Sequence, residues 1–236
     1  MGGFRHGRGK MQFRDGATYE GTWYLGRAHG FGQFTHVKGE TYEGEWADDM
    51  RHGIGVMTHL DGMRYHGGWF KNGREGVGAE VLCDQQTFQG NYEDGKKNGY
   101  GIYKWPDGAS YEGNWVQSKI NGFGIYKWAD GRMFTGEWVN CKTGGFGVYT
   151  WTDGRRYEGF FTKDKRQGYG ILMTPNNYTY SGGWFNGKMH GYGFIYTDKG
   201  EFKYGMWASG EKLIKLTQKQ ATEVQEGRMD LYSTIR

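Results

Sequence analysis

The fold is decided by the stretch Tyr42-Glu43-Gly44-Glu45-Trp46, which is followed by His52-Gly53-Ile54-Gly55. The same aromatic-x-Gly-x-aromatic pattern recurs along the chain, and consecutive copies are 23 residues apart without any insertion. The central glycines are Gly21, Gly44, Gly67, Gly90, Gly113, Gly136, Gly159, Gly182 and Gly205. A repeat this regular indicates one small structural unit that is stacked many times.

Each unit begins with a strand-like segment that has two aromatic positions. Two residues before the glycine stand Tyr19, Tyr42, Tyr65, Phe88, Tyr111, Phe134, Tyr157 and Tyr180, with Lys203 in the last copy. Two residues after it stand Trp23, Trp46, Trp69, Tyr92, Trp115, Trp138, Phe161, Trp184 and Trp207. Side chains alternate between the faces of a strand, so both rings and the glycine share one face. We expect an aromatic ring of a neighbouring repeat to lie over each glycine.

The second half of the unit is Gly-x-Gly followed by a β-prone run such as Ile102-Tyr103-Lys104-Trp105. An Asp-Gly turn signal ends the unit at 15–16, 61–62, 107–108, 130–131 and 153–154. This order predicts one β-hairpin per repeat, with a turn joining it to the next hairpin, and about 18 strands in all.

These motifs resemble the MORN repeat (membrane occupation and recognition nexus) over residues 1–210. The resemblance implies an all-β protein, namely an elongated, twisted, single-layer antiparallel sheet of stacked hairpins with an aromatic groove. We expect about nine repeats in 1–210 and a capping or dimerisation tail in 211–236. Departures at Lys203, Cys83-Asp84-Gln85 and Pro175-Asn176-Asn177 leave the local turn geometry and the identity of the last unit open.

Residues 1–16 hold only the second half of a unit. We expect the chain to be a fragment of a longer array, and a natural start at a turn is the alternative. At the other end, residues 211–226 read as a short helix that ends at Gly227, because the glycine-aromatic signature stops after Gly210.

The charge, the cysteines and the length of the apolar runs limit the partners and the location that we expect for this protein. The 30 basic and 26 acidic residues leave a formal charge of +4 and are interleaved, so no nucleic-acid partner is expected. Cys83 and Cys141 lie at non-equivalent positions of different repeats, which fits free thiols in a reducing compartment. No apolar run approaches the roughly 20 residues that span a bilayer. We therefore expect a cytoplasmic protein that is associated with the cytoskeleton, with the inner face of a membrane as a further location.

No asymmetric constellation of catalytic residues is visible, and the carboxylates Glu20, Glu43, Glu112, Glu137 and Glu158 simply recur once per repeat. We expect neither an enzyme nor a cofactor. His59, His66 and Cys83 are zinc candidates by residue type. Equivalent positions of successive hairpins are about 10 Å apart, however, which is too far for one ion to bridge.

A ladder of aromatic residues marks the middle of the chain, with Trp105, Trp128 and Trp151 beside Tyr103, Tyr126 and Tyr149. The rings are either the core of a protein that has no other core or an exposed groove. Such a groove would take a helix or an extended segment of a cytoskeletal or peptide partner. Both interpretations can hold on different faces.

Two functions from different classes follow. The first is a non-enzymatic scaffold and protein interaction module, and the second is a module that binds anionic phosphoinositides. The candidate lipid contacts are Lys127, Arg132, Arg155 and Arg156. The scaffold is favoured because the basic residues are interleaved with acidic ones. The chain also resembles repeat-only members of the family from apicomplexan and kinetoplastid parasites, which implies a homodimeric scaffold of a basal-complex-type structure needed in cell division.

The last unit is atypical, because Lys203 replaces the ring and apolar residues follow at once. An open sheet must cover, charge or pair its edge strand, so we predict a homodimer through residues 182–216. The expected interface residues are Trp184, Tyr192, Phe194, Tyr196, Phe202, Tyr204, Trp207, Leu213 and Leu216. The alternative is a self-contained cap, with the tail helix folded over Trp207.

Overall fold

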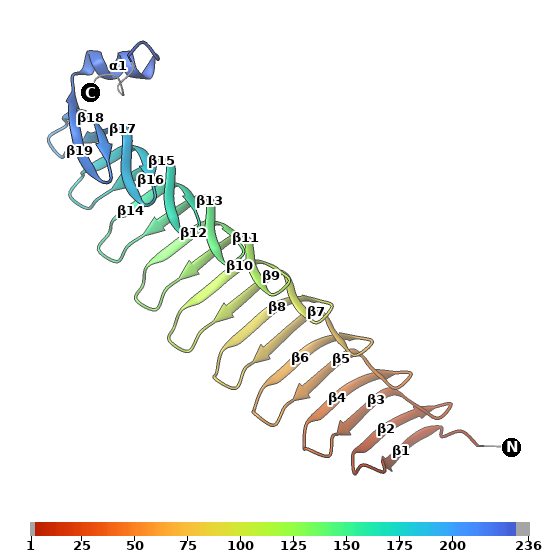
Figure 1. Cartoon of the computed structure of the whole chain (residues 1–236). Coiled ribbons are helices and arrows are strands. Elements are labelled where there is room, and N and C mark those ends of the chain that lie inside the picture. Colours follow the sequence, from red (N-terminus) through yellow and green to blue (C-terminus); the bar gives the residue numbers. More distant parts are fainter. Residues whose placement is uncertain (1–2, 230–236) are drawn as a thin grey trace. The chain divides into compact units, whose positions relative to one another are not determined.

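The computed structural model describes residues 3–229, which form 19 strands and one helix. The strands make one antiparallel sheet of hairpins, as the sequence predicted (Figure 1). The chain divides into two units, Met1–Ile120 and Asn121–Arg236, and each is described by itself. The strands that begin in the first unit are β1 (Gly7–Gln12), β2 (Thr18–Tyr24), β3 (Arg27–Thr35), β4 (Thr41–Ala47), β5 (Met50–Thr58), β6 (Arg64–Phe70), β7 (Gly73–Val81), β8 (Thr87–Glu93), β9 (Lys96–Lys104), β10 (Ser110–Val116) and β11 (Lys119–Lys127). The second unit continues with β12 (Met133–Val139), β13 (Lys142–Thr150), β14 (Arg156–Thr162), β15 (Lys165–Met173), β16 (Thr179–Phe185), β17 (Lys188–Tyr196), β18 (Phe202–Ala208), β19 (Glu211–Leu216) and α1 (Gln218–Gln225).

Each repeat from β2 to β17 is a hairpin of a seven-residue strand and a nine-residue strand. In the hairpin β2–β3 the central Gly21 lies opposite Gly32, and the register shifts by a bulge before Trp23 pairs with Ala28. The longer strand absorbs the two extra residues. The same glycine pairing and the same shift recur in the hairpins β6–β7, β8–β9, β12–β13, β14–β15 and β16–β17.

The rings and the paired glycines lie on one face of the sheet, here called the ring face. The Tyr19 ring crosses both Gly21 and Gly32, and its hydroxyl donates to the Thr22 carbonyl at 3.0 Å. A Cβ on either glycine would overlap this ring. The prediction that each glycine seats a ring of a neighbouring repeat is therefore wrong. The ring comes from the same strand, because a tyrosine two residues away can lean along the strand over a bare Cα.

Neighbouring repeats are joined by the second aromatic position. Trp46 contacts Tyr19 of the preceding hairpin and Tyr42 of its own strand edge to face, at centroid distances of 5.4 and 5.1 Å. Its indole N–H donates to the Gly32 carbonyl at 3.0 Å. Equivalent edge-to-face pairs run through each unit, and every pair contributes about 0.5–1.5 kcal/mol beyond its buried area. The residues at the first position that are at most 1% exposed are Tyr19, Tyr42, Tyr65, Phe88, Tyr111, Phe134, Tyr157 and Tyr180.

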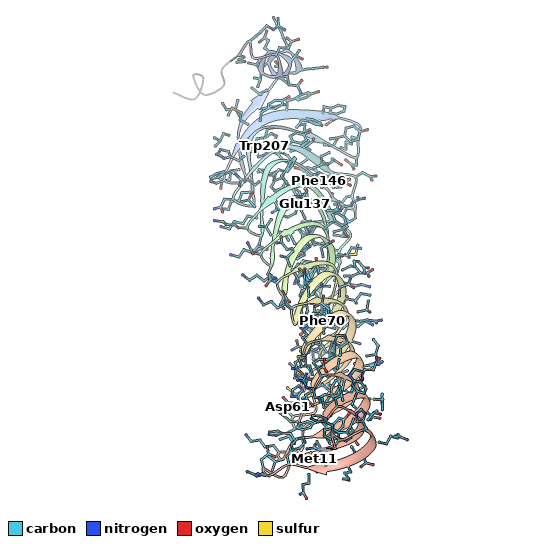
Figure 2. The ribbon with its side chains drawn as sticks, turned by 90° about the vertical axis from the view of Figure 1, so that its right-hand side faces the viewer. Met11, Asp61, Phe70, Glu137, Phe146 and Trp207 are labelled. Atoms are coloured by element: carbon cyan, nitrogen blue, oxygen red, sulfur yellow. The ribbon has the colours of Figure 1, made fainter. Side chains whose placement is uncertain are left out.

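The other face, here called the second face, is solvated and carries the recurring glutamates. Large apolar side chains of several repeats are nevertheless exposed on it, including Phe31 and Phe146 at 56% and 47%. Figure 2 shows Phe146 beside Glu137, whose Oε1 accepts from the Phe146 N–H at 3.4 Å.

The turns between hairpins keep one geometry even where the sequence departs from Asp-Gly. In the turn after β1, Asp15 Oδ1 accepts from Ala17 N–H at 3.0 Å and Gly16 has a φ of 93°. Gln85 and Asn177 take this left-handed position in the two departing repeats, at φ of 67° and 56°. The departures thus change residue types and leave the turn intact.

The C-terminal tail differs from the prediction of a helix over 211–226. Residues 211–216 form the nineteenth strand, β19, which pairs with β18. This segment pairs with the edge of the sheet and does not form a helix, because Ile214 and Leu216 are spaced by two and lie opposite Met206 and Tyr204. Helix α1 follows from the N-cap Thr217, whose capping box with Gln220 satisfies both backbone N–H groups.

Helix α1 does not lie over Trp207. Val224 of α1 packs against the buried pair Met206 and Leu216, and Met206 points away from the ring face that Trp207 shares. On the ring face, Lys212 covers the Trp207 ring at 5.3 Å and lies over Gly205, where other repeats place their tyrosine. The last repeat is therefore followed by a strand that pairs with β18, a lysine on the ring face and a helix that packs against the second face.

Candidate functional site

One column of side chains decides how much of the ring face is open. It is the second residue of each odd-numbered strand from β3 on, and Arg5 stands at the equivalent place before β1. We call this column the lid position. Its members are Arg5, Ala28, Arg51, Arg74, Lys97, Ile120, Thr143, Arg166, Met189 and Lys212.

Where the lid is an arginine, it covers a core ring. The guanidinium carbon of Arg51 lies 4.6 Å from the Trp69 centroid, and that of Arg166 lies 4.2 Å from the Trp184 centroid. Each also donates to a backbone carbonyl, Arg51 to Asn72 at 3.2 Å and Arg166 to Gly187 at 2.7 Å. Burial lowers the pKa of both guanidinium groups. These arginines therefore act as covers of the core as well as charges.

A cavity of the first unit opens where the lid is Ala28. It has a volume of 630 Å³, and Trp46 and Tyr42 line it together with Met11, which Figure 2 labels on β1. Trp46 is only half-buried, whereas the tryptophans at the same position of the other described repeats are between 3% and 6% exposed. The cavity is thus the space that a long lid side chain would fill.

The cavity of the first unit is both aromatic and charged. The lids of the two adjacent repeats, Arg5 and Arg51, line it, and so do the carboxylates of Glu40 and Asp49. Asp49 Oδ1 accepts from the Ala28 N–H at 2.7 Å. The remaining walls include Phe13, Phe34, His36 and Met57.

The second unit has its own cavity, of 540 Å³. It opens at Thr143, which like Ala28 is a lid residue with a short side chain. Asp164 Oδ1 accepts from the Thr143 N–H at 2.8 Å, which repeats the arrangement of Asp49 and Ala28. The Thr143 hydroxyl is buried without a hydrogen-bond partner. Phe161 below it stays buried, and Trp128 and Trp151 form the walls.

The predicted aromatic ladder forms part of this cavity. Tyr126 and Trp128 lie 4.7 Å apart, Trp128 and Tyr149 5.3 Å, and Tyr149 and Trp151 4.5 Å, all half-buried. The ladder is therefore packing and groove wall at once, which is the combination that the sequence left open.

The four candidate lipid contacts differ in their surroundings. Arg132 and Arg155 lie over Trp128 and Trp151 and pair with Asp130 and Asp153 at 2.7 and 2.8 Å. Arg156 pairs with Glu158 at 2.7 Å, and Lys127 is exposed at the end of β11. Three of the four charges are thus neutralised locally.

A buried ionic cluster was not predicted. Glu80 is 3% exposed and contacts the two lid residues Arg74, at 2.7 Å, and Lys97. The signal was present, because Glu80 occupies a position that holds Phe34, Met57 and Tyr103 in neighbouring repeats. A buried carboxylate at an otherwise apolar position needs a cation partner.

The zinc candidates are not brought together. His59 lies in a turn, 3.5 Å from Glu40, His66 is exposed on the second face in β6, and Cys83 is exposed in the turn after β7. Within residues 3–229 no group of three His, Cys, Asp or Glu side chains could hold a metal ion. No helix of this part of the chain is long and apolar enough to cross a membrane.

The nine predicted interface residues fall into two groups. Trp184, Trp207 and Leu216 are buried within the chain, and Tyr192 and Tyr204 pack beside the Met206–Leu216 cluster. Four residues remain on or near the surface. They are Phe194, Tyr196, Phe202 and Leu213, and the last three are 39%, 54% and 52% exposed.

Comparison with known families matches the repeats one by one. The model of the MORN repeat matches residues 1–18, 19–41, 42–64, 88–110, 111–131, 134–155, 157–177 and 180–200. The chain belongs to the MORN repeat family. Residues 65–87 are not matched, yet this MORN unit forms the same hairpin, β6–β7, in the same register. It is the unit that holds Glu80 and the Cys83-Asp84-Gln85 turn.

Solved structures that resemble this MORN protein share little sequence with it. The wild-type TCP10 domain of Danio rerio CPAP is 11% identical, with a TM-score of 0.48 over 88% of this chain and 99% of that one. The SAS-4 (dCPAP) TCP domain of Drosophila melanogaster, in complex with a proline rich motif of Ana2, is 14% identical, with a TM-score of 0.40 over 73% and 87%. At these values the likeness carries no functional conclusion. No curated protein matches the sequence.

Proposed function

We propose that this MORN array is a non-catalytic scaffold that binds segments of partner proteins in the two ring-face cavities. The observation that carries the proposal is the lid column. The cavity of each unit opens beside a short lid residue, Ala28 or Thr143, and at Ala28 the ring of Trp46 is left partly exposed. Apolar cavities with a few polar groups are the usual binding sites of proteins.

A random peptide library displayed on phage and selected on the full chain tests this function. Selected peptides are then titrated by fluorescence anisotropy against the wild type, Ala28→Arg and Thr143→Arg. Because arginine is the natural lid of other repeats, both variants are expected to fold. Ala79→Arg is the matched control, since it adds the same side chain at an exposed position of the second face. We expect at least tenfold weaker binding in one lid variant and no change in the control. Binding that neither lid variant weakens would refute the proposal.

We further propose that the scaffold is a cytoplasmic homodimer associated with the cytoskeleton, of the kind used in division structures. The support is an aromatic cluster in which the exposed Phe202 ring lies 5.8 Å from the Phe194 centroid and 4.9 Å from that of the exposed Tyr196. Exposed clusters of this type commonly mark interfaces. Light scattering should give a dimer for the wild type and for Leu60→Glu, an exposed control, and a monomer for Phe202→Glu. A monomeric wild type would refute this part.

Phosphoinositide binding remains the alternative function. The pairing of Arg132, Arg155 and Arg156 with carboxylates supports only weak attraction to an anionic surface. Sedimentation with phosphoinositide-containing vesicles at physiological salt should leave the protein in solution. Co-sedimentation that resists salt would favour the lipid function over the scaffold.

A further inference from the structure

Trp46 is held like the other core tryptophans but is not covered like them. Its indole N–H donates to the Gly32 carbonyl at 3.0 Å, as that of Trp69 donates to Gly55 at 3.2 Å. Trp69 is 6% exposed under the Arg51 lid, and Trp46 is half-buried next to Ala28. One face of the Trp46 indole is thus preorganised and open.

The neighbouring repeats show what fits this face. A single arginine at the lid position stacks on the ring and donates to the backbone carbonyl of the residue 21 positions later, as in Arg51 with Trp69 and Asn72. Arg166 does the same with Trp184 and Gly187 in the second unit. For Ala28 the corresponding ring is Trp46 and the corresponding residue is Asp49, so the acceptor and the stacking surface are both present.

The charges at this cavity suit a cation. Asp49 brings a carboxylate to the place where the Arg51 repeat has the neutral Asn72, and Glu40 lines the same cavity. Arg51, Arg74 and Lys97 occupy three consecutive lid positions in this unit, and the buried carboxylate of Glu80 pairs with the last two. Asp49 and Glu40 offer carboxylates in the same way to a further cation between Arg5 and Arg51.

We propose that the cavity of the first unit binds an arginine side chain of a partner protein, which serves as the lid that Ala28 does not provide. The guanidinium stacks on Trp46 and pairs with Asp49. This inference rests on the proposed function, because it names the chemistry of one of the two cavities. Stacking of a cation on an indole together with an ion pair makes an arginine about tenfold better than a neutral side chain of the same shape.

The test uses the full, isotope-labelled chain and follows the indole N–H resonance of Trp46 by NMR. The probe is acetyl-Gly-Arg-Gly-amide, and the control probe carries citrulline, which has the shape of arginine without its charge. We expect the Trp46 resonance to shift saturably with the arginine probe and about tenfold more weakly with citrulline. Equal responses to both probes, or no response, would overturn the proposal.

Four variants locate the probe. Ala28→Arg should abolish the Trp46 response. If Ala28→Arg does not fold, Ala28→Met is used in its place, since Met189 occupies the lid position of another repeat. Asp49→Asn keeps the shape and should weaken binding severalfold. Arg51→Ala should create a second response, at Trp69, because it copies the Ala28 opening. A Trp46 response that persists in a folded Ala28→Arg or Ala28→Met protein would place the probe elsewhere and refute the assignment.

The outcomes separate this inference from the proposed function. If selected peptides bind and are blocked by Ala28→Arg, but their affinity survives replacement of every arginine by citrulline, the cavity is a binding site of another chemistry. The function then stands and the arginine proposal fails. If no peptide is selected and the tripeptide gives no shift, both fail.

Discussion

Replacing Tyr65 by phenylalanine should change the sign of its effect on stability between neutral and alkaline pH. Tyr65 is fully buried, and its hydroxyl donates to the Gly68 carbonyl at 3.0 Å. Loss of this hydrogen bond costs about 0.5–1.5 kcal/mol at pH 7. Steric change is small, because Phe88 and Phe134 occupy the same position in other repeats.

At high pH the Tyr65 hydroxyl lowers the stability of the folded state. Burial raises the pKa of Tyr65 to about 12, and that of Tyr19 to about 12 as well. The unfolded chain loses the phenol proton near pH 10, so above that pH the folded state binds more protons than the unfolded state. The stability that depends on the neutral phenol is complete below pH 10 and is lost as pH rises towards 12. The slope is about 1.4 kcal/mol per pH unit for each such tyrosine.

For Tyr65 the loss therefore reaches about 2.3 kcal/mol at pH 12, which exceeds the hydrogen-bond contribution. Tyr65→Phe should be less stable than the wild type at pH 7, equal to it between about pH 10 and 11 and more stable above that range. Urea denaturation followed by circular dichroism at several pH values measures this crossover.

The control is Tyr24→Phe, because Tyr24 is 53% exposed and lies on the solvated side of β2. Loss of this exposed hydroxyl should change the free energy of unfolding at pH 7 by no more than about 0.5 kcal/mol. A Tyr65→Phe curve that stays parallel to the wild type up to pH 12 would show that the Tyr65 hydroxyl is not buried, and would refute the ring core described here.

Two further substitutions test other parts of the core. Gly32→Ala places a Cβ inside the Tyr19 ring and should destabilise the folded protein by about 1–3 kcal/mol or more. In the control Gly9→Ala, the added Cβ meets Trp23 only at an ordinary 3.6 Å. Equal losses of stability in urea denaturation would contradict the position of the Tyr19 ring over Gly32. Glu80→Gln leaves Arg74 and Lys97 without their buried carboxylate and should cost about 3 kcal/mol, or roughly 6–12 °C in melting temperature. The control Glu43→Gln removes an exposed carboxylate of the second face and should change the melting temperature little, so equal losses for Glu43→Gln and Glu80→Gln would disprove the ionic explanation.

The repeat length, the strands and the turns could be predicted because each depends on residues that are close in sequence. A glycine between two aromatic residues identifies a strand with period 2, and Asp-Gly identifies the turn. Which ring covers the glycine could not be derived in the same way. Both the same strand and the next repeat offer an aromatic residue, and only the packing distinguishes Tyr19 from its neighbours.

The tail shows a limit of a different kind. Residues 211–216 are rich in Glu, Lys and Leu, which favour a helix, but an unpaired edge of β18 lies beside them. The spacing of Ile214 and Leu216 by two was the available signal for a strand. Edge pairing is a tertiary effect that propensity does not contain.

The cavities were missed because the lid position lies outside the motif that defines the repeat. Aligned at 23 residues, the column contains six cations and only two residues, Ala28 and Thr143, with side chains too short to cover a ring. The two short residues of this column could have been noticed in the sequence. Their relation to the cavities required the structure, since only the contacts of Arg51 and Arg166 show that this column covers the core.

The central claim is that a short lid residue makes the binding site, and a calorimetric titration of one library-selected peptide tests it most directly. The peptide is titrated into the wild type, Ala28→Arg, Thr143→Arg and the Ala79→Arg control, and the melting temperature of each protein is measured alongside. The account predicts that one lid variant loses at least tenfold in affinity while its melting temperature stays equal or rises, because the added arginine covers exposed rings. Unchanged affinity in both folded lid variants would contradict it.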